Sequence, residues 1–340
     1  MFCKSSTNRQ IVKIFTGESF PHNFITFALQ LEGPAPHLQP IPRKMKHTAI
    51  ALLSALILIS CAPKPETDGE TLCVTILPLR SLVGEIVGGD FAIDVLVPPG
   101  ASPETFEPTP RQIGALNRAR MIFGVGLLDF EASLLQKIEN GEKVITLNRG
   151  IEPLEGTCAH AHHPDEADSG QVGVALHGHT HGIDPHIWTS PRALQRMAGN
   201  AYEAIHAAWP DSAKYTENYR RLAEKLQELD RRTGEKITRS GVKAFIVYHP
   251  ALTYYARDYG IRQEAVETDG KEPSAKRLAE LIRAAREDGI RKILYQKQFP
   301  VSVVETIARD IDARAVEIDP LREDVIANID SITDIITDAR

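Results

Sequence analysis

Histidine is concentrated in one short part of this chain. Seven of its twelve histidines fall between Cys158 and His186, in a stretch that also carries several carboxylates. Imidazole is the commonest borderline-soft metal ligand in proteins, and carboxylates often share its sites. The density of these side chains therefore indicates a transition metal, with zinc or a close relative as the candidate.

Most of these histidines lie in a segment rich in Gly, Ala, Asp and Glu that has no apolar periodicity, which is typical of a loop. A His-rich loop can collect metal but cannot hold one geometry, and a solvated polar insertion is the alternative interpretation. We place this loop at residues 157–182. Its histidines are His160, His162, His163, His177, His179 and His181.

His186 differs from the loop histidines because its surroundings fix it in place. Pro185 restricts the backbone beside the imidazole. Ser190 and Pro191 then offer a cap and a first turn for a helix. We therefore predict His186 as a placed metal ligand.

Three further candidates follow predicted strands. A proline-rich loop after one strand presents Glu104, and two later strands end directly in His249 and Asp319. Ligands of open parallel sheets bind beyond the carboxyl ends of the strands. A lone His or Asp at a strand end usually caps a helix or makes a hydrogen bond. These three residues together with His186 make four candidates, two from each half of the chain. They predict a metal site between two lobes.

Short β-branched runs alternate with helical patterns through most of the chain, as in βαβ units with parallel sheets. The strands form two sets, which predict an α/β fold of two lobes. The first set is Cys73–Leu77, Ile93–Val97, Met121–Phe123 and Val144–Leu147, and the second is Ala244–Tyr248, Glu264–Val266, Lys292–Tyr295 and Ala313–Ile318.

A long helix is expected between the two sets of strands. Apolar residues recur at three- and four-residue steps from Tyr215 to Ile237, and Pro210-Asp211 supplies a start. The pattern predicts one helix over residues 211–238, of roughly 27 residues and about 40 Å. Such a helix would join the lobes stiffly, although an ordinary amphipathic helix is the plainer interpretation.

The chain has a secretion-type segment before Cys61. Residues 45–60 combine a charged start with a short apolar run, and the run is too short to span a bilayer. The segment predicts a bacterial lipoprotein signal with Cys61 as the lipid acceptor and residues 61–71 as a tether. A buried apolar helix is the alternative, and residues 1–44, which show no comparable pattern, are left out of the fold.

Charge and cysteine content limit the function further. From Cys61 onward 33 Lys and Arg accompany 43 Asp and Glu, a net charge of −10. This balance argues against nucleic-acid binding and suits a small cation. There is no CxxC pair, which argues against a structural zinc site. Cys73 is expected to be buried, and Cys158 is expected to bind metal together with the loop histidines. The sequence does not decide whether the two cysteines form a disulfide.

Four motifs together resemble the metal-site motifs of the zinc and manganese substrate-binding proteins of ABC transporters. They are GASPETFEPTP at 100–110, DPHIW at 184–188, YHPA at 248–251 and DPL at 319–321. The resemblance covers residues 72–340. It implies two α/β lobes joined by a long rigid helix, with the metal buried between them. It also implies Glu104, His186, His249 and Asp319 as the ligands.

The chain departs from that family at two positions. The family usually has His where Glu104 stands, and two nitrogens with two carboxylates suit manganese or iron better than three imidazoles do. The His-rich loop instead resembles the zinc members, and we give it more weight, so zinc is expected with Mn²⁺ or Fe²⁺ as alternatives. Gln296 stands where the family often has an acidic residue, which puts in doubt a role for this residue in supporting the metal ligands.

The resemblance implies a receptor rather than an enzyme. We expect a monomer, lipid-anchored at Cys61 outside the cytoplasm, that passes zinc to an ABC permease and its ATPase. The expected parts are an N-terminal lobe at 72–190, a helical linker at 191–240 and a C-terminal lobe at 241–340. A zinc hydrolase with Glu107 as base is the rival from another class, although no HExxH or nucleophile motif supports it. A metal buffer without a permease is another.

Overall fold

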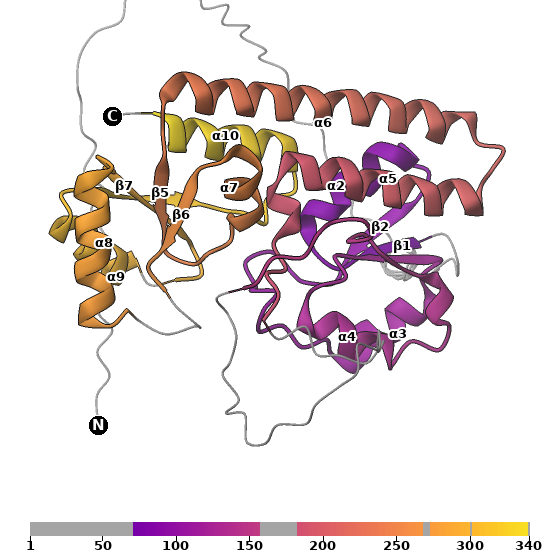
Figure 1. The fold of residues 1–340 in the computed structure, drawn as a ribbon. Helices are drawn as coiled ribbons and strands as arrows, with labels where there is room; N and C mark the ends of the chain where they lie inside the picture. The colour runs from indigo at the N-terminus through magenta and orange to yellow at the C-terminus, as the bar shows by residue number, and fades with distance from the viewer. Residues whose placement is uncertain (1–70, 157–181, 268–272, 300, 339–340) are drawn as a thin grey trace, which may run out of the picture. The chain divides into compact units, whose positions relative to one another are not determined.

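The computed structural model describes residues 71–156, 182–267, 273–299 and 301–338. These residues form two α/β lobes, each built on a four-stranded sheet whose neighbouring strands are all parallel (Figure 1). The strand orders are β2-β1-β3-β4 and β6-β5-β7-β8. In both sheets the chain first moves to one side of its opening strand and then to the other, and ligands bind at the point where this direction reverses.

The N-terminal sheet is centred on β1 (Thr71–Val74) and β3 (Met121–Gly124). Both strands are lined by buried residues, as expected for parallel strands that are covered on two faces. β2 (Ala92–Val95) is one of the two edge strands and is more exposed. The lobe also contains β4 (Val144–Thr146), α2 (Leu77–Val87), α3 (Pro110–Arg118), α4 (Asp129–Leu135) and the 3-10 turn η1 (Gly141–Lys143).

Cys73 lies in the centre of this sheet, between Asp94 of β2 and Ile122 of β3. Its side chain is buried, as the sequence predicts. Burial, with a smaller contribution from Asp94, raises the pKa of the thiol to about 12. The thiol is therefore uncharged at neutral pH and a poor metal ligand or nucleophile. Cys158, its conceivable disulfide partner, lies outside the described residues.

The C-terminal sheet repeats this plan around β5 (Ala244–Val247) and β7 (Lys292–Gln296), which are again mostly buried. The carboxyl end of β5 leads into the segment that holds His249, and Gln296 is the last residue of β7. The other elements of the lobe are β6 (Arg262–Ala265), β8 (Arg314–Ile318), α7 (Thr253–Tyr259), α8 (Ala275–Glu287), α9 (Val301–Asp310) and α10 (Val325–Thr337).

Two helices connect the sheets. α5 (Pro191–Ala208) begins as predicted, with Pro191 in its first turn and Ser190 as its cap, whose hydroxyl accepts a hydrogen bond from the Ala193 N–H. α6 (Ala213–Ser240) has 28 residues, about 42 Å at 1.5 Å per residue. It contacts α2 and α5 in one direction and α10 in the other (Figure 1).

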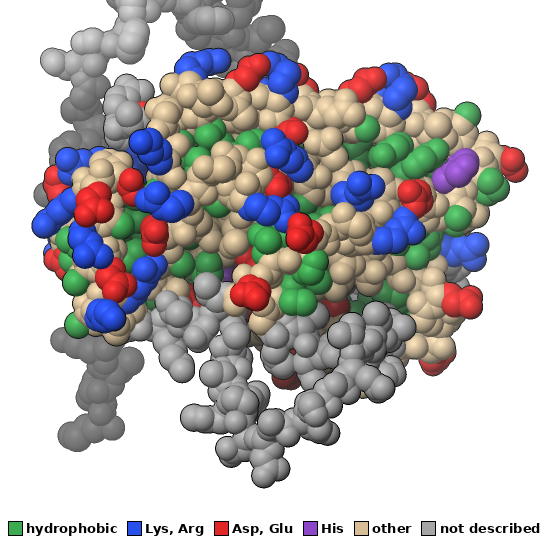
Figure 2. All heavy atoms as spheres, viewed as in Figure 1, with side chains coloured by type: hydrophobic (Ala, Val, Ile, Leu, Met, Phe, Trp, Pro, Cys, Tyr) green, Lys and Arg blue, Asp and Glu red, His purple; other side chains and the backbone are tan. Residues whose placement is uncertain are grey.

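α6 is amphipathic along its whole length. Its buried face carries Leu222, Leu226 and Leu229, which join an apolar core that includes residues of both sheets. Its outer face carries Lys and Arg interspersed with Asp and Glu (Figure 2), including the pairs of Arg220 with Glu217 and Glu224. The helix therefore belongs to one continuous core that ties the two lobes together.

The predicted fold class is confirmed. All eight predicted strands are present with small shifts in their ends, and the predicted long helix is α6. The helix begins at Ala213 rather than Asp211, because a turn precedes it in which the Ser212 N–H donates to the carbonyl of Trp209. No helix among the residues that the structure describes has the length and apolarity needed to cross a membrane.

Asp330 of α10 provides a test of the contact between α6 and α10. It pairs with Arg232 and with Lys236, whose Nζ lies 3.3 Å from its Oδ1. Burial acts to raise the pKa of Asp330, but the two cations outweigh it and hold the pKa below the usual 3.8. The stabilisation is therefore complete above pH 3.8 and is lost as the pH falls through the lowered value.

We expect Asp330→Asn to lower the free energy of unfolding at pH 7 by about 1 kcal/mol, since the pair still contacts solvent. Urea denaturation in the presence of a chelator should show this loss. The difference in the free energy of unfolding between the variant and wild type should become smaller below pH 3.8. Glu235→Gln, which removes an exposed pair within α6 alone, serves as the control with a smaller loss. A difference that persists unchanged at low pH would contradict this account.

Candidate metal site

Glu104 reaches the site from the proline-rich loop that follows β2. Leu96 and Val97 still bond to the neighbouring strand, since their N–H groups donate to the carbonyls of Val74 and Thr75. The chain then leaves the sheet and enters α3 through a capping box at Thr109. Held at both ends, the loop presents the Glu104 side chain, which is 30% exposed.

His186 is held by a carboxylate two residues before it. Oδ1 of Asp184 accepts hydrogen bonds from the backbone N–H of His186 and from Nδ1 of its ring, both at 2.8 Å. Burial opposes the charge on Asp184, but the His186 contacts outweigh it and lower the pKa of this carboxyl. With the proton on Nδ1, the lone pair of Nε2 is available to a metal.

His249 lies two residues after β5 and is contacted by three neighbours. Its Nδ1 lies 3.5 Å from Oε1 of Glu267, and its carbonyl accepts a hydrogen bond of 3.0 Å from Nε2 of Gln296. Phe299 stacks on its ring with centroids 5.3 Å apart. Glu267 and Gln296 are both buried. These neighbours hold His249 in place, and it too directs Nε2 toward the site.

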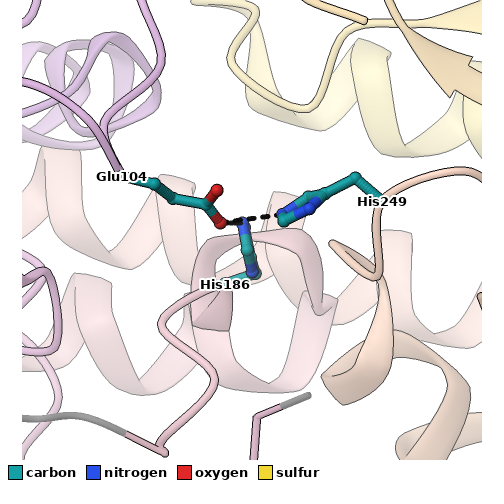
Figure 3. Close-up of side chains that lie close together, drawn as sticks. All are labelled: Glu104, His186 and His249. Atoms are coloured by element: carbon teal, nitrogen blue, oxygen red, sulfur yellow. Dashed lines mark ion pairs between the residues drawn. The ribbon is translucent and has the colours of Figure 1, made fainter. Parts of the chain in front are cut away.

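These three side chains converge (Figure 3). Oε1 of Glu104 lies 3.4 Å from Nε2 of His186 and 2.8 Å from Nε2 of His249, and one donor atom from each residue lies within 4.8 Å of the others. The 2.8 Å approach is an ion pair, and Nε2 of His249 is buried without a hydrogen-bond partner among the described residues. Donors bound at about 2.1 Å to a tetrahedral ion lie about 3.4 Å apart, so the spacing fits one metal ion.

The charges around the pocket favour a cation. Burial acts to lower the pKa of His249, but the carboxylates of Glu104 and Glu267 outweigh it and raise the pKa to about 9. Burial likewise acts to raise the pKa of Glu104, and the two histidines outweigh it and lower it. A metal ion can take the place of the proton on His249, as a positive charge between the same carboxylates.

The pocket itself is small. It has a volume of about 40 Å³ and is lined by the three converging residues together with Trp188, Phe299 and Leu321 among others. No lysine or arginine is among the described residues that line it. Two imidazole nitrogens and a carboxylate oxygen form a donor set that suits zinc.

Asp319 lies outside this three-residue group. Its Oδ2 is 3.1 Å from Nζ of Lys297, and its Oδ1 accepts a hydrogen bond from the N–H of Leu321 at 3.1 Å. The next residue, Pro320, does line the pocket, and its carbonyl accepts a hydrogen bond from the Trp188 indole at 3.0 Å. Asp319 is thus at the edge of the pocket, and its role as a ligand stays a prediction.

Sequence reasoning missed two buried residues of the site and doubted a third. Asp184 belongs to a predicted motif, but the motif does not predict that it orients His186. Glu267 comes two residues after β6 and is not among the predicted residues, although the strand-end rule applies to it. Gln296, doubted because it is not acidic, instead holds the backbone of His249. The loop histidines lie outside the described residues.

The match to a family model agrees with this geometry. The model described as zinc-uptake complex component A, periplasmic (ZnuA), matches residues 72–339. The chain belongs to the ZnuA family.

Individual relatives support the assignment. The zinc-binding lipoprotein AdcA of Streptococcus pneumoniae is 25% identical over 279 residues, which are 80% of this chain and 54% of AdcA. The high-affinity zinc uptake system protein ZnuA of Bacillus subtilis is 28% identical over 257 residues, which are 73% of this chain and 78% of that protein. A crystal structure of ZnuA matches with a TM-score of 0.68 and 31% identity, covering 79% of this chain and 98% of that one. The chain spans about half the length of the streptococcal relatives it matches.

Asp184 offers a test of how the site is oriented. We expect Asp184→Ala to weaken zinc binding roughly 10- to 100-fold, because the His186 ring loses the acceptor that selects its tautomer. Asp184→Asn keeps the shape and one acceptor, so its loss should be smaller. Competition titration against a chelator measures both. Asp211→Ala, in the exposed turn before α6, is the control, and wild-type affinity in Asp184→Ala would show that the contact does not orient the ligand.

Proposed function

We propose that this protein is an extracytoplasmic receptor that binds zinc and delivers it to the permease of an ABC transporter. The observation that carries the proposal is the convergence of Glu104, His186 and His249, from three separate segments and both lobes, on one buried pocket. A site built between two lobes can bind an ion and release it to a partner. It needs no reaction.

Zinc is the cargo that the donor set and the relatives favour together. Two imidazoles with one carboxylate match common zinc sites, and the named relatives in Streptococcus pneumoniae and Bacillus subtilis are described by zinc binding and zinc uptake. Manganese or iron is the alternative, because Glu104 replaces one imidazole by a harder oxygen donor.

We further propose that Asp319 completes the ligand set when the ion is bound. The loop histidines would act as auxiliary collectors, which raise the local supply of zinc without forming the tight site. Cys61 would carry the lipid that anchors a monomer at the membrane, beside the permease and its ATPase. The acidic balance of the chain from Cys61 onward suits this role and not nucleic-acid binding.

Two other functions are disfavoured by particular observations. A zinc hydrolase needs a general base beside the ion, but Glu107, its candidate, is exposed and does not line the pocket. A metal buffer without a permease would keep the same site. Membership of a transport family argues against it, and neighbouring genes for an ATPase and a permease would distinguish the two.

Substitutions of Glu104 test the primary site. Glu104→Ala should weaken zinc binding by at least about 100-fold, more than the loss of an outer partner costs. Glu104→His exchanges an oxygen for a nitrogen donor and should shift the preference from manganese toward zinc. Competition titrations with both metals measure this. Glu107→Ala is the matched control in the same loop, and wild-type values in both Glu104 variants would show that Glu104 is not a ligand.

Deletion of residues 158–181 tests whether the loop only collects metal while the primary site binds it tightly. We expect the number of bound zinc ions to fall while one tight site remains, because the four proposed ligands lie outside the deleted segment. Elemental analysis after dialysis, together with a zinc titration, counts the ions. Loss of all tight binding would place the primary site in the loop.

A further inference from the structure

A lysine ammonium stands at the edge of a pocket that is otherwise arranged for a cation. Nζ of Lys297 lies 3.1 Å from Oδ2 of Asp319. The residues on both sides of Lys297, Gln296 and Gln298, line the pocket, as does Pro320 after Asp319. The pair therefore bridges the two strand ends, of β7 and β8, that border the pocket in the C-terminal lobe.

The backbone at Asp319 is fixed and Oδ1 of its carboxylate accepts a hydrogen bond from the Leu321 N–H, while Oδ2 pairs with an exposed lysine. The Asp319 carbonyl accepts a hydrogen bond of 2.8 Å from Nδ2 of Asn328, and the Pro320 carbonyl accepts one of 3.0 Å from the Trp188 indole, two residues from His186. Among the described residues, Oδ2 is paired with Lys297, whose side chain is 44% exposed. A lysine stem is flexible and binds as a point charge, so this contact can be exchanged at small cost.

We propose that Lys297 is an internal competitor for the metal. It pairs with Asp319 in the metal-free receptor and gives up this carboxylate when zinc binds, so that Asp319 joins Glu104, His186 and His249. On release, the ammonium takes Asp319 back. This inference rests on the proposed function and adds to it a residue that sets affinity and release.

The competition has a consequence for affinity. Zinc must displace an ammonium from Asp319 and then coexist with its positive charge nearby, and both effects weaken binding. A receptor has to surrender its ion to a permease, so a built-in cation that favours the metal-free state assists delivery. An ordinary surface ion pair, in contrast, would leave zinc affinity unchanged.

A double-mutant cycle separates these possibilities. We expect Lys297→Met to tighten zinc binding roughly three- to tenfold and to slow dissociation in a chelator-exchange assay. In the Asp319→Asn background the same substitution should change affinity by less than about twofold. Lys297→Arg should stay near wild type. Lys225→Met is the matched control, since Lys225 is an exposed lysine paired at 2.8 Å with Glu85, away from the pocket.

Titrations at about 0.15 M salt, where the Debye length is about 8 Å, reduce general charge effects. X-ray absorption of the zinc-loaded protein gives a second readout, with one oxygen donor fewer in Asp319→Asn than in wild type. An equal effect of Lys297→Met in both backgrounds, or no effect, would overturn the inference. If wild type and Glu104→Ala both failed to bind zinc tightly, the proposed function itself would fail, which is a different result.

Discussion

The metal site depends on how firmly the two lobes are held against each other. Glu104 and His186 lie before α5, and His249 lies after α6, so a shift between lobes would separate their donor atoms. Several buried hydrogen bonds oppose such a shift. The Tyr254 hydroxyl donates to the carbonyl of Asp184 at 2.8 Å, and the Thr189 hydroxyl contacts the carbonyl of Ala251 at 3.0 Å.

The apolar core provides the larger part of this rigidity. One cluster of buried residues runs from the N-terminal sheet through α5 and α6 to α10 and includes Phe245 and Ile318 of the C-terminal sheet. Close-packed interiors resist deformation. The ligands are therefore placed before any metal arrives, and less binding energy is spent on ordering them.

Electrostatics oppose stability at this site and favour function. Asp184 and Glu267 are nearly fully buried, and Glu104 is partly buried beside two imidazoles. Buried carboxylates are costly unless cations accompany them. In the metal-free protein a proton on His249, whose pKa is raised to about 9, supplies part of that charge. A divalent ion supplies more positive charge than this proton does, so the pocket favours a divalent cation.

The sequence by itself determined the two-lobe α/β fold, the long helix, and Glu104, His186 and His249 as candidates, because strand ends and helix starts follow from local patterns of apolar residues and proline. The tertiary structure decided the neighbours of these ligands. Glu267 and Gln296 contact His249 across 18 and 47 residues, and Lys297 reaches Asp319 across 22. Such contacts depend on how the strands of one sheet are ordered, and local spacing in the sequence does not encode that order.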